Sequence, residues 1–196
     1  MKLAPLIPFS GLNEELTRGY TIHAGATVSR SQIELIFKIE AKTSAAFSEI
    51  VFPEPVTQGH RKDELWKSTC FESFIPSQGT PAYLEFNGAP SGDWNWYAFE
   101  DYRKEMKPVP LTARLEPRAV SLSKSNKDLE MCWVLPLAGV AHGLGMHVNT
   151  SHALGPLGLT VVLQTKHAVT YWALSHAGPK PDFHQRASFR YDPLRN

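Results

Sequence analysis

Apolar and polar residues alternate along much of the chain, a pattern typical of β-strands that bury one face. In the clearest run, over residues 32–39, every second position is apolar: Ile33, Leu35, Phe37 and Ile39. Shorter runs predict further strands over residues 20–28, 49–52, 69–75, 82–87, 94–101, 111–115, 119–124, 129–135, 159–165 and 169–175. Turn-forming residues separate most of these runs, which indicates a β-sandwich or a barrel.

Helical patterns are short and few. Residues 12–16 suit a single turn, and residues 136–144 suit a short helix that begins at Pro136 and ends near Gly143 or Gly145. Strands and helices do not alternate, and neither a repeat nor a linker divides the chain. We therefore expect an all-β fold: a two-sheet antiparallel β-sandwich, jelly-roll or immunoglobulin-like, with one or two short helices, as a single domain over residues 1–196.

Composition and charge argue against several classes of partner. The chain has 196 residues, of which 42% are hydrophobic and 20% charged, and its formal net charge is +1. Lys and Arg are scattered and form no basic stripe, so nucleic acid binding is not expected. No run of about 18 apolar residues predicts a membrane span. Prolines interrupt the apolar start of the chain before a secretory signal could form, so we expect a cytoplasmic protein.

A hairpin is predicted where residues 87–93 join two of the expected strands, because this segment is rich in residues that tolerate turn conformations. On its first strand, Leu84 and Phe86 point to one side while Glu85 and Asn87 point to the other. If the strand at residues 69–75 is a neighbour of this one, Glu72 shares a face with Glu85.

The second strand of the hairpin is aromatic on both faces. Trp94 and Trp96 point to one side, and Tyr97 and Phe99 point to the other. One pair must fill the core, which leaves the other pair on an outer or concave face. The sequence does not decide which pair is which.

Aromatic rings beside carboxylate, amide and guanidinium groups suit saccharide recognition, because rings pack on the apolar faces of a sugar and planar polar groups bind its hydroxyls. We expect the tryptophans to form a platform, Glu85 and Asn87 to hydrogen-bond hydroxyls, and Arg103 to hold an anionic group. The candidate ligand-binding residues are Trp66, Glu72, Glu85, Asn87, Trp94, Trp96 and Arg103.

Several motifs in order also suggest a family. They are LWKSTCFESF at residues 65–74, YLEFN at 83–87 with PSG at 90–92, WYAF at 96–99 with DYR at 101–103, YWALSH at 171–176 and KPDFH at 180–184. In these motifs the chain resembles the DOMON-like superfamily, in particular a stand-alone bacterial branch related to family-nine carbohydrate-binding modules. The resemblance implies a jelly-roll-like sandwich that binds a sugar or a haem and has no catalytic activity. A small sugar, a nucleotide sugar or another cytoplasmic ligand remains open.

Other chemistries receive less support from the sequence. Haem binding would need a Met or His pair, and Met106 has no evident His partner. His176, Asp182 and His184 match no strong metal-ligand spacing. No GxSxG, Walker or GxGxxG motif indicates an enzyme, and the two cysteines are expected to be free thiols. We therefore expect neither catalysis, a cofactor nor a metal; a haem-binding domain and a protein interaction module stay as alternatives, and the oligomeric state is open.

Overall fold

The computed structural model describes residues 2–11, 13–54, 59–146 and 154–193. The strands of this part of the chain are β1 (Ala4–Pro8), β2 (Tyr20–Val28), β3 (Gln32–Ala41), β4 (Cys70–Pro76), β5 (Tyr83–Gly88), β6 (Trp94–Phe99), β7 (Lys107–Pro108), β8 (Arg118–Lys124), β9 (Asp128–Pro136), β10 (Gly158–Gln164) and β11 (Val169–Ala173). The α-helices are α1 (Glu14–Thr17), α2 (Ser44–Ser48) and α3 (Leu137–Gly143), and short 3-10 turns include η1 (Leu65–Lys67), η2 (Ala113–Leu115) and η4 (Arg186–Ser188). None of the helices described here is long and apolar enough to span a membrane.

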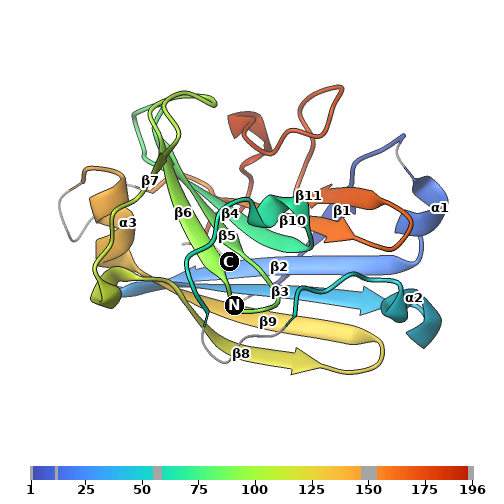
Figure 1. Cartoon of the computed structure of the whole chain (residues 1–196). Helices are drawn as coiled ribbons and strands as arrows, with labels where there is room; N and C mark the ends of the chain where they lie inside the picture. The colour runs from blue at the N-terminus through green and yellow to red at the C-terminus, as the bar shows by residue number, and fades with distance from the viewer. Residues whose placement is uncertain (1, 12, 55–58, 147–153, 194–196) are drawn as a thin grey trace.

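All these strands belong to one curled antiparallel sheet, in the order β7-β6-β5-β4-β10-β11-β1-β2-β3-β9-β8 (Figure 1). The predicted all-β class is confirmed. The predicted division into two sheets is not confirmed, because β1 joins the two halves. It pairs with β11 through Ile7 and Ala173 and with β2 through Leu6 and Ile22. The curl brings the halves face to face: the rings of Phe37 and Phe71 stack 5.1 Å apart across the core.

Alternate residues of the central strands fill the space between the two halves. Ile33, Leu35, Phe37 and Ile39 of β3 are fully buried, as their spacing predicts. Burying one such side chain contributes about 1.5–3 kcal/mol to folding. The alternating apolar positions therefore supply the main stabilisation of the sheet.

Some segments differ from the prediction because proline or capping chemistry outweighs hydrophobic spacing. Residues 111–115 form no strand but contain the 3-10 turn η2, between Pro110 and Pro117. Residues 49–52 contribute only an isolated bridge, between Ile50 and Thr165. The unpredicted helix α2 begins after Thr43, whose hydroxyl accepts a hydrogen bond from the Ala46 amide at 3.0 Å.

The predicted hairpin is confirmed, and its first strand ends at a glycine that the core requires. β5 pairs antiparallel with β6, and Gly88 faces the Trp133 ring of β9. A β-carbon at Gly88 would lie 2.6 Å from a carbon of that ring. The absent side chain therefore lets the two halves of the sheet pack closely at this point.

Replacing Gly88 by alanine is expected to lower the free energy of unfolding by about 1–3 kcal/mol, because the methyl group overpacks the core against Trp133. Urea unfolding followed by circular dichroism measures the change. Gly178→Ala is the control, since the nearest atom to its added carbon lies 3.9 Å away. Equal unfolding midpoints for the two variants would contradict this packing.

Candidate functional site

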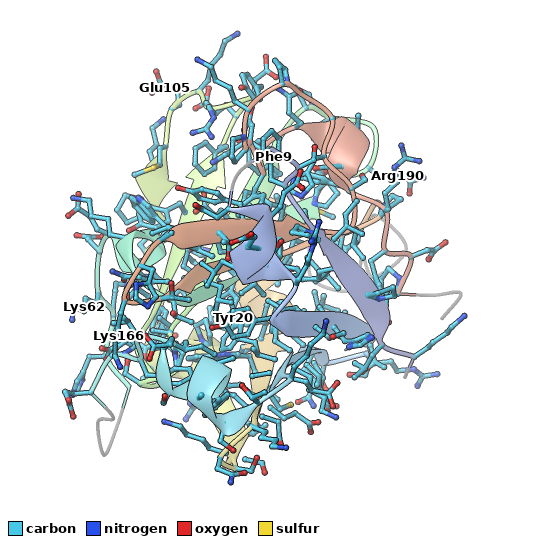
Figure 2. The ribbon with its side chains drawn as sticks, turned by 90° about the vertical axis from the view of Figure 1, so that its right-hand side faces the viewer. Phe9, Tyr20, Lys62, Glu105, Lys166 and Arg190 are labelled. Carbon is cyan, nitrogen blue, oxygen red and sulfur yellow. The ribbon has the colours of Figure 1, made fainter. Side chains whose placement is uncertain are left out.

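The half of the sheet that contains β6, β5, β4, β10 and β11 is covered on both faces. Every residue of β4 and β5 is buried. One face of these strands meets the other half of the sheet, and the opposite face is covered by η1, the loop after β6 and the segment after β11. Figures 1 and 2 show the loop after β6, where Glu105 lies, and the C-terminal segment on the same side of the sheet.

A cavity of about 340 Å³ lies between this face and its cover. Side chains from the sheet form its floor, and η1 and the two covering segments form its walls. The lining residues are Trp66, Glu72, Phe74, Glu85, Phe99, Arg103, Met106, Val162, Tyr171, Pro181, Phe183 and His184. Rings, carboxylates and a guanidinium thus converge on one hollow, which is the usual composition of a small-molecule site.

Two acidic side chains lie on the floor of the cavity. Glu72 and Glu85 are only 3% and 5% exposed. In the pairing of β4 with β5, Glu72 lies opposite Asn87 and Glu85 lies opposite Phe74, so the two glutamates occupy diagonal positions on one face. β4 and β5 are neighbours, which is the condition under which the sequence predicted a shared face for Glu72 and Glu85.

Each carboxylate accepts a hydrogen bond from an adjacent side chain. The Thr160 hydroxyl of β10 donates to Oε2 of Glu72 at 3.2 Å. The Asn87 amide donates to Oε1 of Glu85 at 2.7 Å. These bonds orient both carboxylates from within the sheet, so little rearrangement is needed before a ligand binds.

Burial raises the pKa of both carboxyl groups above the ordinary value for glutamate. Removal from water raises the pKa of Glu85 to about 7, although the Asn87 hydrogen bond and Arg103 oppose the rise. Burial raises the pKa of Glu72 well above its ordinary value, and the negative charge of Glu85 adds to this effect. Near neutral pH the Glu85 carboxyl can therefore accept or donate a proton or a hydrogen bond.

His184 lies beside Glu85 as a neutral imidazole. Its Nδ1 is 2.7 Å from the Tyr83 hydroxyl, which in turn accepts a hydrogen bond from the Arg103 amide. If Tyr83 donates to Nδ1, the ring proton is on Nε2, which lies 3.6 Å from Oε2 of Glu85. Burial, reinforced by the charge of Arg103, lowers the pKa of His184 to about 4.

The two covering segments are held together at the rim of the cavity. Arg103 forms an ion pair with Asp182 at 3.0 Å, and the Tyr102 hydroxyl donates to Asp182 at 2.5 Å. Burial opposes the ionisation of Asp182, but hydrogen bonds from Tyr102, Gln185 and Arg103 outweigh it and lower the pKa to about 2. Arg103 itself adopts a φ of 52°, a strained conformation that these contacts retain.

The structure brings together four of the seven candidate residues. Trp66, Glu72, Glu85 and Arg103 line the cavity, and Asn87 lies beside it as a hydrogen-bond donor to Glu85. Their role in ligand binding stays a prediction.

The expected platform of Trp94 and Trp96 requires a correction. These residues are 4% and 0% exposed and belong to the core between the two halves of the sheet. Strand parity puts Tyr97 and Phe99 on the opposite face of β6, and Phe99 lines the cavity. The two tryptophans fill the core, so other aromatic rings line the cavity.

Sequence reasoning did not place the C-terminal segment at the cavity. Phe183 and His184 reach the cavity from a turn-rich stretch whose path local patterns do not predict. His184 and Met106 both line the cavity, so a His and a Met do lie near each other. The His184 ring nitrogens already face Tyr83 and Glu85. His176, in contrast, contacts the Ile7 carbonyl at 3.0 Å, and the described residues contain no group of three side chains suited to a metal ion.

Comparisons with known proteins agree with this architecture. No protein-family model matches the chain, and no curated protein matches its sequence. Among solved structures, it is similar to a proposed carbohydrate-binding protein from Bacteroides uniformis, with a TM-score of 0.64 and 14% identity over 97% of this chain and 84% of that chain. A family 9 carbohydrate-binding module from Caldicellulosiruptor kristjanssonii, in complex with glucose, has a TM-score of 0.42 and 8% identity over 87% of this chain and 73% of that chain. At 14% identity, the first match shows a shared fold.

Proposed function

We propose that the chain is a non-catalytic carbohydrate-binding protein and that the ligand occupies the cavity above β4 and β5. One observation carries the proposal: two buried carboxylates, oriented by Thr160 and Asn87, lie on the floor of a hollow whose lining is rich in aromatic rings. Hydroxyl groups need such acceptors and donors, and the C–H faces of a sugar ring pack well on aromatic rings.

The dimensions of the cavity favour a small ligand. Its volume of about 340 Å³ is near the lower end for small-molecule sites. One sugar ring suits this space better than a polymer segment. Trp66 supplies a half-buried ring at the wall, and its neighbour Tyr97 holds it in an edge-to-face contact with centroids 5.6 Å apart.

The resemblance to the DOMON-like superfamily supports the same proposal, as does the shared fold with the proposed carbohydrate-binding protein from Bacteroides uniformis. We assign the chain to that superfamily as part of the proposal, as one cytoplasmic domain of the jelly-roll type. The two glutamates are assigned to hydrogen bonding with the ligand, because their carboxylates line the cavity and are oriented there by Thr160 and Asn87.

A haem-binding function is the second candidate, since Met106 and His184 line the same cavity. Ligation by His184 would require its ring to leave Tyr83 or Glu85. Adding haem to the purified protein and recording the absorption spectrum separates the two candidates. A Soret band that disappears in the His184→Ala variant would favour haem over sugar.

Alanine at Trp66 is expected to weaken monosaccharide binding at least tenfold, because an aromatic contact contributes about 0.5–1.5 kcal/mol beyond the area it buries. Isothermal titration calorimetry with a panel of monosaccharides measures the change. Phe52→Ala is the matched control: Phe52 is also half-buried but lies against Phe47, outside the cavity lining. Unchanged affinity in Trp66→Ala, or equal losses in both variants, would contradict the assignment.

A further inference from the structure

Acidic side chains in the cavity outnumber cationic ones. Glu72 and Glu85 both line it, and Arg103 is its basic lining residue. The Arg103 guanidinium is hydrogen-bonded to Asp182 at 3.0 Å. Its charge favours ionisation of both glutamates, but within the described residues no lysine or arginine forms an ion pair with either of them. The two carboxylates therefore lack a direct counter-charge.

The carboxylates also have unused hydrogen-bonding capacity. Within the described residues Glu72 accepts one hydrogen bond, at Oε2 from Thr160, and its Oε1 has no hydrogen-bond partner. Oε2 of Glu85 lies 3.6 Å from His184 Nε2, which is longer than a hydrogen bond. A side chain that is 97% buried yet keeps a free acceptor beside a cavity is suited to a donor on a ligand.

The aromatic lining of the cavity favours a cation as well. Trp66, Phe99 and Tyr171 contribute aromatic rings to the lining, and the faces of such rings attract ammonium groups. Neutral His184 supplies no competing positive charge near neutral pH, because its pKa is lowered to about 4 by burial and by Arg103.

We propose that the ligand carries a protonated amine, which lies between Glu72 and Glu85, so that the preferred carbohydrate is an amino sugar with a free amine. This inference rests on the proposed carbohydrate function. An ammonium group has three N–H donors and can reach an oxygen of each carboxylate. N-acetylation removes this charge and two of these donors, so the acetylated sugar loses the interaction.

Proton release accompanies binding of the amine. The titratable groups around the two glutamates are Cys70, Tyr83, Tyr97, Arg103 and His184, with Asp182 behind Arg103. Free Glu85 has a pKa of about 7 and is partly protonated at pH 6.5. An ammonium group beside it favours the carboxylate and expels the proton. A hydroxyl group carries no charge and causes much smaller release.

Calorimetric titration tests the inference with glucose, its 2-amino and 6-amino derivatives, and the N-acetyl form of each amine. At pH 6.5 at least one amine is expected to bind ten times more tightly than its own N-acetyl form and than glucose. Titrations in phosphate and in ACES, which buffer at this pH, differ in ionisation enthalpy and supply no primary ammonium group, are expected to show proton release with that amine. Glucose or an N-acetyl sugar binding as tightly as the amines would overturn the inference.

Two charge-removing variants and one further probe separate the outcomes. Glu72→Gln is expected to reduce the tenfold preference below threefold, while Glu116→Gln, at an exposed position outside the cavity lining, leaves it unchanged. Glucose binding without any preference for amines overturns the amine inference and leaves the carbohydrate function standing. If cyclohexylamine binds as tightly as the amino sugars, the carbohydrate function is overturned, and recognition of an ammonium group by the two glutamates is supported. Binding of none of these probes overturns both.

Discussion

Alanine in place of Trp96 is expected to lower the free energy of unfolding by about 3–5 kcal/mol, the usual range when a large buried ring is lost. The Trp96 side chain is fully buried between the two halves of the sheet. It packs edge to face with Phe86, at a centroid distance of 6.4 Å, and fits so closely that a β-carbon at Gly139 would lie 2.9 Å from its ring. Chemical denaturation followed by circular dichroism measures the change.

Trp96→Phe serves as the control, because it keeps a ring in the core and should recover part of the lost stability. A Trp96→Ala variant with unchanged stability but lost sugar binding would place this ring in the ligand site. That result would support the aromatic platform predicted from the sequence.

Glutamine in place of Glu85 is expected to stabilise the unliganded protein more at pH 8 than at pH 5, by up to about 3 kcal/mol. Burial raises the pKa of Glu85 from 4.5 to about 7 in the folded state. Between these values the folded protein holds a proton that unfolding releases, so stability falls as the pH rises toward 7 and levels off above it. The glutamine side chain stays neutral, so the variant does not lose stability in this way as the pH rises. Melting temperatures at matched ionic strength give the comparison.

His184 has the opposite effect at lower pH, so the informative quantity is the difference between variant and wild type. Its pKa falls from 6.5 to about 4 on folding, which costs stability as the pH drops through this range. Glu116→Gln controls for loss of an exposed charge. A Glu85→Gln variant with the same pH profile as the wild type would show that the Glu85 carboxyl is hydrated and has an ordinary pKa.

The sequence predicts the parts of this fold that depend on local alternation. The spacing of Ile33, Leu35, Phe37 and Ile39 correctly indicated which face of β3 is buried. The turn residues after Asn87 correctly indicated the hairpin. Such features follow from backbone geometry over a few residues, so they need no knowledge of what packs on the other side.

Long-range features could not be predicted from the sequence, because they depend on which strands and loops pack against one another. Strand parity grouped Trp94 with Trp96, but only packing against the other half of the sheet makes theirs the core side of β6. The pairing of β1 with both β11 and β2 closes the curl, although Pro5 and Pro8 weaken its appearance as a strand. His184 reaches Tyr83 across 101 positions of sequence, which no local pattern encodes.

The most direct measurement of where a sugar binds is a nitrogen-15 NMR titration with glucose and 2-amino-2-deoxyglucose. We expect the largest shifts at the Trp66 indole and at the backbone amides of β4 and β5, near Glu72 and Glu85, because these groups surround the cavity. Shifts confined to the outer face of β3 and β9, around Lys38 and Glu130, or no shifts at saturating sugar, would contradict carbohydrate binding in this cavity.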